Sequence, residues 1–243
     1  MSSLFVSDLH LSHERRDKVD LFVKILARVQ EQQISLYILG DLFDLWLGDD
    51  DDAYPNREIV EALGHASRDG ASIYIALGNR DFLFREVFKR KTGARILDDY
   101  TVIELNSEKT LLTHGDLLCT RDVAYQKFRR VVRNPLFSAF FLALPLKWRK
   151  KIGGKTREKT QNSTQMKTNS IMDVDSQTVL SVMEKYNTSL LIHGHTHRPG
   201  THVFELNNAP ARRIVLGDWY SQGLMLLCSD DGEKSLTAEE FLA

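Results

Sequence analysis

The sequence has 243 residues, of which 42% are hydrophobic and 27% charged, and this predicts a packed soluble core of one large domain or two small ones. Two cysteines exclude a disulfide framework and a zinc-finger pattern, and the lack of long apolar stretches excludes a signal peptide and a membrane-spanning helix. The net charge of −1 conceals a segment from Arg121 to Lys167 in which 13 Lys and Arg face two acids, and this net charge of +11 favours polyanionic partners.

The first half of the chain alternates strands with helices. Apolar runs predict strands at residues 4–6, 36–39 and 72–77, and helical periodicity predicts helices at residues 17–32, 58–68 and 82–91. Two further strands, at residues 101–105 and 110–113, are predicted to form a hairpin around Asn106-Ser107-Glu108. This order is typical of an α/β domain.

The region from Arg121 to Tyr186 has no strand signal and predicts a helical insertion. Its parts are a basic amphipathic helix at residues 124–132, an apolar segment at 135–148 bounded by prolines, a basic helix at 155–167 and a final helix that begins near Asp173. We therefore expect a domain core of residues 1–120 and 187–243, with residues 121–186 as an inserted lid.

Strands return after the insertion. They are predicted at residues 189–192, 201–206, 212–216 and 224–228. An antiparallel run of this kind suggests a second sheet. The predicted fold is an α/β sandwich of two sheets flanked by helices, with the helical insertion forming a lid.

Five short polar motifs each follow a strand-like run. They are Asp8-Leu9-His10, Gly40-Asp41-Leu42-Phe43-Asp44, Gly78-Asn79-Arg80-Asp81, His114-Gly115-Asp116 and Gly194-His195-Thr196-His197. Open α/β sheets place their sites past the carboxyl ends of strands, so these motifs are expected to converge. Oxygen and imidazole ligands suit Mn, Fe or Zn ions, and a pair of such ions promotes displacement at phosphorus.

The spacing within the motifs adds to this interpretation. Asp8 and His10 alternate, as do His195 and His197, so as strand residues each pair would face one side. Two neighbouring ions need a carboxylate that binds both, and Asp41 is the best candidate.

With these motifs the sequence resembles the calcineurin-like metallophosphoesterases. More narrowly, Gly78-Asn79-Arg80-Asp81, the run from Leu47 to Asp52 and the run from Ile192 to Pro199 resemble the UDP-2,3-diacylglucosamine pyrophosphatase family of lipid A synthesis, over nearly the whole chain. The resemblance implies two Mn²⁺ ions. It implies that the first is held by Asp8, His10, Asp41 and His197, and the second by Asp41, Asn79, His114 and His195.

The resemblance also implies a reaction. Water activated by both ions would attack the α-phosphorus of UDP-2,3-diacylglucosamine and release UMP and 2,3-diacylglucosamine 1-phosphate. The catalytic residues would be Asp41, Asn79, Arg80 and His195. Many relatives have His at position 80, which can protonate a leaving alkoxide, whereas Arg80 stays charged and is suited to neutralise a leaving phosphate. Arg80 therefore favours a pyrophosphate over a simple monoester. Asp44 and Asp116 are expected to orient imidazoles.

The insertion is expected to bind the lipid part of the substrate. An apolar slot for acyl chains would be lined by Phe128, Phe137, Phe140, Phe141, Leu144 and Trp148. A basic rim on anionic lipid would consist of Arg129, Arg130, Arg133, Arg149, Lys150 and Lys151. By resemblance, the headgroup would be bound by Asn79, Arg80, Asp122, Thr160, Thr164, Lys167 and His195. Thr160 stands where the family often has Ser.

These expectations place the protein in a reducing cytosol, as a monomer at the cytoplasmic face of the inner membrane of a Gram-negative bacterium, without nucleic acid as a partner. A metal-dependent nuclease or nucleotide phosphatase is the alternative, and a non-catalytic scaffold is a third reading. Apolar clustering of the aromatic residues speaks against the nuclease. The run from Asp49 to Asp52 is expected to be a solvated loop, with a third cation site as its alternative, and His193 a buried strand residue.

Overall fold

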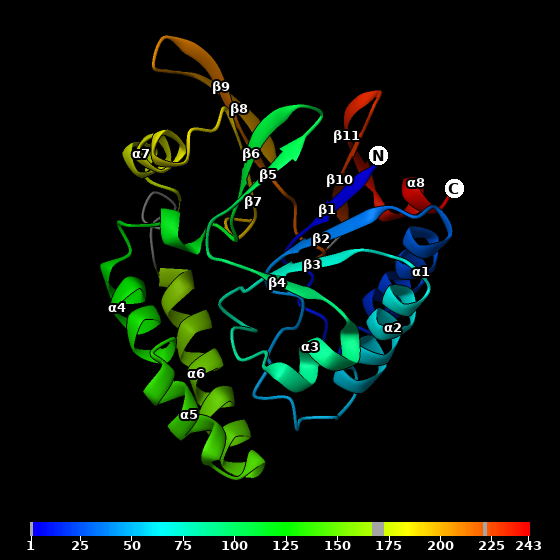
Figure 1. Cartoon of the computed structure of the whole chain (residues 1–243). Helices are drawn as coiled ribbons and strands as arrows, with labels where there is room; N and C mark the ends of the chain where they lie inside the picture. The colour runs from blue at the N-terminus through cyan, green and yellow to red at the C-terminus, as the bar shows by residue number, and fades with distance from the viewer. Residues whose placement is uncertain (1, 167–172, 221–222) are drawn as a thin grey trace.

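In the computed structural model, two sheets lie face to face between layers of helices (Figure 1). The structure describes residues 2–166, 173–220 and 223–243, and for residues 158–166 the course of the backbone alone. The predicted sandwich of two sheets flanked by helices is confirmed. Among the helices that the structure describes, none combines the length and the apolar composition needed to cross a bilayer.

The first sheet has six strands in the order β11-β10-β1-β2-β3-β4. Their bounds are β1 Ser3–Val6, β2 Ser35–Leu39, β3 Ile73–Ala76, β4 Arg95–Leu97, β10 Leu224–Ser229 and β11 Gly232–Thr237. Strands β1 to β4 run parallel, so their carboxyl ends lie at one edge of the sheet. Three helices connect them, namely α1 Arg16–Glu31, α2 Asn56–Arg68 and α3 Glu86–Thr92. A short helix, α8 Ala238–Leu242, ends the chain.

The second sheet has five strands in the order β5-β6-β7-β9-β8. Their bounds are β5 Thr101–Leu105, β6 Glu108–Leu112, β7 Leu190–His193, β8 Gly200–Leu206 and β9 Ala209–Val215. The predicted hairpin forms between β5 and β6, and the positive φ angles of Asn106 (49°) and Ser107 (66°) make its two-residue turn. Strands β6 and β7 run parallel. Helix α7 Ser176–Tyr186 packs on this sheet through Val179 and Met183.

The core consists of successive apolar layers. In β1, Leu4 and Val6 pack toward α1 and α2, while Phe5 packs between the two sheets against residues such as Ile192. Burial on both faces explains why the parallel strands read as continuous apolar runs rather than as alternating ones.

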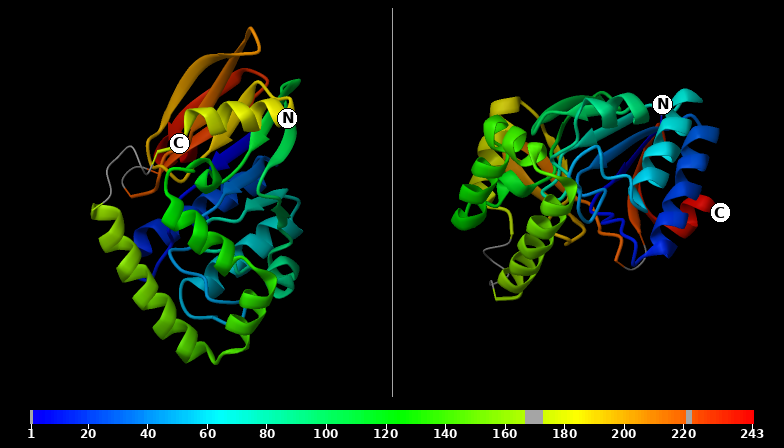
Figure 2. Two further views of the ribbon diagram at one scale, coloured as in Figure 1. Left: turned by 90° about the vertical axis from the view of Figure 1, so that its left-hand side faces the viewer. Right: turned by 90° about the horizontal axis from the view of Figure 1, so that it is seen from below.

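Three helices between β6 and β7 form a group beside the sandwich, on the side away from α1 and α2 (Figures 1 and 2). They are α4 Val123–Val132, α5 Pro135–Ala143 and α6 Leu146–Met166, and the short 3-10 helix Asp116–Leu118 precedes them. Asn134 caps α5 by accepting the backbone N–H of Leu136, and Pro135 occupies the first turn. Helix α6 begins well before the predicted residue 155. The division into a core and a lid of residues 121–186 stays a prediction.

Some boundaries differ from the prediction for a physical reason. Helix α3 was predicted from residue 82 but begins at Glu86, because the carboxylate of Asp49 accepts the N–H groups of Arg85 (3.1 Å) and Phe88 (2.8 Å). A cap donated from a distant loop leaves no local signal in the sequence. The edge strands β4 and β11 and the final helix α8 were not predicted.

Candidate metal centre

The five polar motifs lie in the loops that follow β1, β2, β3, β6 and β7. The prediction that Asp8 with His10, and His195 with His197, face one side as alternating strand residues was wrong. The strands end before these motifs, and the backbone is left-handed at the candidate ligands. The φ angles are positive at Asp8 (55°), His10 (47°), Asp41 (54°), His195 (69°) and His197 (54°). Such conformations are uncommon for residues other than glycine and cluster at functional sites.

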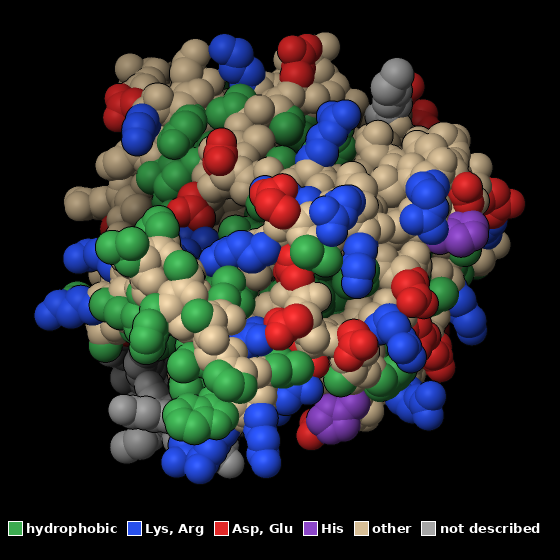
Figure 3. Space-filling view, turned by 60° about the horizontal axis from the view of Figure 1, so that its bottom comes forward, with side chains coloured by type: hydrophobic (Ala, Val, Ile, Leu, Met, Phe, Trp, Pro, Cys, Tyr) green, Lys and Arg blue, Asp and Glu red, His purple; other side chains and the backbone are tan. Residues whose placement is uncertain are grey.

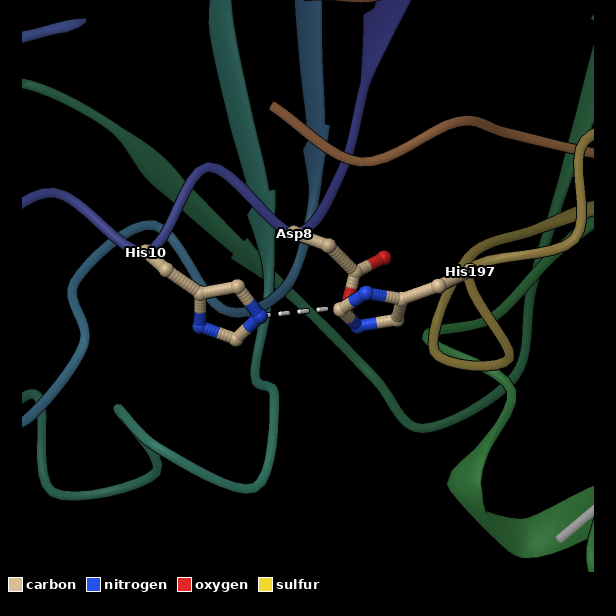
Figure 4. A group of neighbouring side chains, drawn as sticks. All are labelled: Asp8, His10 and His197. Atoms are coloured by element: carbon tan, nitrogen blue, oxygen red, sulfur yellow. Dashed lines mark ion pairs between the residues drawn. The ribbon is translucent and has the colours of Figure 1, made fainter. Parts of the chain in front are cut away.

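Asp8 belongs to the first group, and the rings of His10 and His197 both approach its carboxylate (Figure 4). Its Oδ2 atom accepts hydrogen bonds from the Ser7 hydroxyl (2.6 Å) and the His195 N–H (2.8 Å). Its buried Oδ1 atom lies 3.3 Å from His197 Nε2 and has no hydrogen-bond donor among the described residues. Both ring nitrogens of His10 are likewise buried without such a partner. Buried ligand atoms left without partners are what a metal ion would satisfy.

Asp41 faces both halves of the centre. Its Oδ2 atom lies 3.9 Å from His10 Nε2, and its Oδ1 atom lies 3.9 Å from His114 Nε2. Oδ1 also accepts the backbone N–H of Arg80 at 2.9 Å, which fixes the carboxylate plane. One carboxylate thus presents an oxygen to each of two ligand groups, as a bridging residue must.

The second group forms around Asn79. Its Oδ1 atom lies 3.1 Å from His114 Nε2 and 3.0 Å from His195 Nδ1. His114 Nδ1 donates to the Leu39 carbonyl at 2.8 Å, and this contact orients the ring so that Nε2 faces the centre. The structure therefore brings together the seven side chains that the resemblance implied as ligands, and their metal-binding roles remain a prediction.

Two glycines permit this close approach. A Cβ atom on Gly78 would lie 2.1 Å from Asp41 Oδ1, and one on Gly194 would lie 1.9 Å from the Ser7 hydroxyl. Any larger residue would push the Asn79 or His195 loop away from its partner. The glycine of each motif is thus as necessary to the geometry as the ligand that follows it.

The electrostatics of the cluster suit a cation. Burial lowers the pKa of His10 and of His195 to about 4, so both rings are neutral at pH 7. Burial and the charge of Asp8 raise the pKa of Asp41 to about 6. Burial also disfavours the ionised form of Asp8, but contact with His197 and the charges of the histidines outweigh it and lower its pKa. Burial disfavours the charged forms of His114 and His197, but the neighbouring aspartates outweigh it, so the pKa of His114 is raised and that of His197 is raised to about 9. The carboxylates, the two neutral imidazoles and a histidine that carries a proton form a donor set in which a divalent ion would supply the positive charge.

The expected roles of Asp44 and Asp116 were wrong. Asp44 pairs with Arg157 of α6 at 2.8 Å. Asp116 accepts the Tyr125 hydroxyl (2.6 Å) and Arg129 Nε (2.7 Å), both from α4. Both carboxylates therefore bind donors from the insertion instead of an imidazole.

A different carboxylate orients an imidazole. Asp218 Oδ2 lies 3.1 Å from His197 Nδ1, and the ring of Tyr220 stacks on His10 with centroids 5.6 Å apart. Neither residue was predicted from the sequence. Gly217-Asp218 comes one residue after the end of β9, much as Gly40-Asp41 follows β2, and this similarity was the signal available.

An apolar pocket of about 190 Å³ adjoins the metal ligands. Asn79 and Arg80 line its polar end, and Phe128, Phe137 and Phe141 line it from α4 and α5. The other three residues expected in the slot, Phe140, Leu144 and Trp148, do not line this pocket, and Phe140 and Trp148 are 68% and 64% exposed. Tyr125, Phe82 and Arg157 also line the pocket and were not predicted to do so.

Half of the predicted basic rim is not available to a membrane. Arg129 and Arg149 are buried, at 8% and 2% exposure. Arg129 and Arg133 share Asp99 (2.8 and 3.0 Å), and Arg149 pairs with Asp50. Arg130, Lys150 and Lys151 are exposed.

The acidic run is not the purely solvated loop that was expected, and a third cation site there stays an untested alternative. Asp49 caps α3, Asp50 pairs with Arg149, and Asp51 pairs with Lys150 at 2.8 Å. Its carboxylates thus fasten α6 to the core. His193 is fully buried, as expected.

The predicted headgroup residues are only partly placed. Asp122 is the N-terminal cap of α4, where it accepts the Tyr125 N–H at 3.1 Å. Lys167 and the side chains of Thr160 and Thr164 lie outside the described residues.

Fold and site together define a metal-dependent phosphoesterase, and comparison with known proteins agrees. Residues 1–199 match the family model described as calcineurin-like phosphoesterase. The chain belongs to this family, whose membership implies a divalent metal at the centre.

More similar relatives narrow the assignment. The chain is 44% identical over 236 residues to a UDP-2,3-diacylglucosamine hydrolase of Aeromonas hydrophila, covering 97% of this chain and 98% of the relative. It is 46% identical to a protein of the same name from Ectopseudomonas mendocina, with 94% and 95% covered. The phosphoesterase Yfce of E. coli shares the fold at 17% identity, with a TM-score of 0.50 over 99% of this chain and 94% of that one. Both levels of the predicted resemblance are thereby confirmed.

Proposed function

We propose that this chain hydrolyses the pyrophosphate bond of UDP-2,3-diacylglucosamine at the α-phosphate, and that 2,3-diacylglucosamine 1-phosphate and UMP are the products. The observation that carries the proposal is that Asn79 and Arg80 belong both to the polar cluster and to the wall of the apolar pocket. A substrate with a diphosphate next to acyl chains would place each part in a matching environment. The identity to the named hydrolases supports the same substrate.

The ligand set fits two ions, which we propose to be Mn²⁺. The first would be held by Asp8, His10, Asp41 and His197, and the second by Asp41, Asn79, His114 and His195. When bound, such ions supply Lewis acidity and an activated water for attack at phosphorus. Asp41 holds the two groups at a fixed separation through its two oxygens.

Arg80 is proposed to neutralise the leaving phosphate. Its backbone is fixed on both sides, since its N–H donates to Asp41 and its carbonyl accepts the N–H of Trp46 at 3.0 Å. Its buried Nε atom has no hydrogen-bond partner among the described residues. A fixed backbone and an unpaired guanidinium N–H give a preorganised donor for a phosphate oxygen. His195 and Asn79 would position the phosphoryl group beside it.

The insertion is proposed to bind the membrane through the exposed side chains of α5 and of the start of α6. Leu136, Phe140 and Trp148 are 82%, 68% and 64% exposed, and Lys147 and Lys151 are exposed nearby in α6. Hydrophobic side chains gather at one end of the face shown in Figure 3, beside Lys and Arg side chains. Such a surface suits the cytoplasmic side of an anionic inner membrane. We propose a monomer bound there peripherally, with the headgroup reaching Asp122 and the segment that includes Thr160, Thr164 and Lys167.

The nuclease alternative finds less support. Of the basic residues between Arg121 and Lys167, Arg121, Arg129, Arg133, Arg149, Lys150 and Arg157 form ion pairs with aspartates. Much of the positive charge that would attract a nucleic acid is therefore neutralised within the fold.

A panel of three substrates tests the proposal. The protein with Mn²⁺ is mixed in detergent micelles with UDP-2,3-diacylglucosamine, a single-stranded oligonucleotide and a chromogenic phosphate monoester. We expect UMP release from the first at a rate at least 10³-fold above the other two, because remote binding energy accelerates only the matched substrate. Equal or faster cleavage of the oligonucleotide would establish the nuclease instead.

The pocket itself gives a paired prediction on α5. Phe137→Ala should lower kcat/KM for the diacylated substrate in micelles by about 10- to 100-fold, because an acyl chain in the pocket would cover the Phe137 ring, which is 41% exposed without it, and full burial of such a side chain is worth about 1.5–3 kcal/mol. Phe140→Ala, which changes an exposed ring on the same helix, should leave this value unchanged in micelles and weaken binding to anionic vesicles. Equal kcat/KM for the two variants in micelles would show that this pocket does not bind the acyl chains.

A further inference from the structure

Hydrogen bonds from several elements fix the backbone of the turn that carries Asn79 and Arg80. The Gly78 N–H donates to Asp81 Oδ1 at 2.9 Å, and the Arg80 N–H donates to Asp41 Oδ1 at 2.9 Å. The Arg80 carbonyl accepts the Trp46 N–H at 3.0 Å. The carbonyls of Leu77 and Gly78 are also bound. Both accept hydrogen bonds from one atom of another element, Arg133 Nη2, at 3.0 and 2.8 Å.

Arg133 is the residue that ends helix α4, so it belongs to the predicted lid rather than to the sheets. Its Nη1 atom donates to Asp99 Oδ1 at 3.0 Å, its guanidinium lies 5.7 Å from the centre of the Phe82 ring, and its side chain is 15% exposed. Asp99 also binds Arg129, which in turn binds Asp116, two residues after the proposed ligand His114. One face of α4 is therefore tied to two of the ligand loops.

The chemistry of this position requires a guanidinium. One planar fork donates to two carbonyls and a carboxylate at once, which the single ammonium of a lysine cannot reproduce in the same geometry. A nearly buried cation is retained where its donors are satisfied, as they are here. Arg133 is not one of the proposed ligands and lies outside the motifs that define the family resemblance. Its side chain donates to Asp99, Leu77 and Gly78, and none of these is a proposed metal ligand.

We propose that Arg133 is a positioning residue, which fixes the turn of Leu77 to Arg80 and thereby sets the places of Asn79 as a metal ligand and of Arg80 as a phosphate donor. This inference rests on the metal-binding part of the proposed function and not on the identity of the substrate. It makes the docking of α4 part of the construction of the metal centre.

Three variants test this role, namely Arg133→Met, Arg133→Lys and, as a matched control, Lys127→Met, which changes an exposed cation of the same helix. Mn²⁺ is titrated into each metal-free protein by calorimetry, and kcat and KM are measured in micelles. For Arg133→Met we expect one of the two Mn²⁺ sites to weaken by about 10- to 100-fold while the other changes little, as for residues that support metal ligands. The kcat value should fall by more than KM rises. Arg133→Lys should lie between, and Lys127→Met should match the wild type.

Wild-type Mn²⁺ affinity at both sites together with wild-type kcat in Arg133→Met would overturn the proposal. Equal weakening of both sites would also overturn it, because it would indicate a general loss of structure. If Arg133→Met shows no cooperative thermal transition, Arg133→Lys decides, and unchanged Mn²⁺ affinities in it would refute the role. A wild-type chain that binds two Mn²⁺ but leaves UDP-2,3-diacylglucosamine intact would overturn the proposed substrate, and the Arg133 comparison would still be readable from the titrations.

Discussion

Asp41→Asn should abolish hydrolysis and at the same time stabilise the metal-free protein. Activity should fall by more than about 10³-fold, since a neutral amide cannot bridge two cations and metal assistance is worth several kcal/mol. The stabilisation follows from burial, which together with the charge of Asp8 raises the pKa of the Asp41 carboxyl to about 6. At pH 7 the folded chain must ionise this group in an unfavourable place, and the variant removes that cost.

The sign of this effect depends on pH. An acid whose pKa is raised on folding binds more protons in the folded state, so stability falls as the pH rises from about 4 to about 6. At pH 7 the gain of the metal-free variant should be on the order of 1–3 kcal/mol, or a few degrees in Tm, and it should vanish near pH 4. Thermal melts of metal-free protein measure this, with the exposed Asp52→Asn as control. A variant that Mn²⁺ still stabilises as strongly as the wild type would contradict the bridging role.

Arg80→Met should lower kcat on UDP-2,3-diacylglucosamine by about 10²- to 10³-fold, as expected when one preorganised donor to developing charge is lost. The KM value should change less, because the acyl chains keep their pocket. Added methylguanidinium should restore part of the rate, and it should have no effect on Arg90→Met, a surface arginine of α3. A fall in kcat of less than about fivefold would show that Arg80 does not stabilise the leaving phosphate.

Arg80→His tests whether residue 80 selects the leaving group. An imidazole at this position can protonate an alkoxide, so the variant should gain activity on a chromogenic monoester while it loses activity on the pyrophosphate. Unchanged pyrophosphate hydrolysis without any gain on the monoester would mean that the identity of residue 80 does not select the leaving group.

Most of the fold could be predicted because its signals are local. The strands that carry the ligand motifs are apolar runs ended by polar residues, and helices α1 and α2 show regular apolar spacing. The convergence of the motifs followed from the rule that parallel strands share a carboxyl edge. The start of α3 could not be predicted, because its cap comes from Asp49, far away in the sequence.

The wrong predictions around the site share one cause, which is that the ion pairs and hydrogen bonds there join residues far apart in the sequence. Arg129, Arg133 and Arg149 look like free surface charges in the sequence, and their aspartates are recognised only once the chain is folded. The left-handed loops at Asp8 and His195 leave no pattern distinct from strand alternation. Asp218 was overlooked because it comes from a strand outside the five motifs.

The candidate ligands come from both sheets. Asp8, His10, Asp41 and Asn79 follow strands of the six-stranded sheet, and His114, His195 and His197 follow strands of the five-stranded one. Bound ions would therefore add a cross-link between the two sheets at an edge where apolar side chains and a few hydrogen bonds, such as those from the His195 N–H to Asp8 and from His114 to the Leu39 carbonyl, already join them. Ligands that bind only the folded chain shift the folding equilibrium toward it, so the availability of metal in the cell would govern how long this protein survives as well as how fast it works.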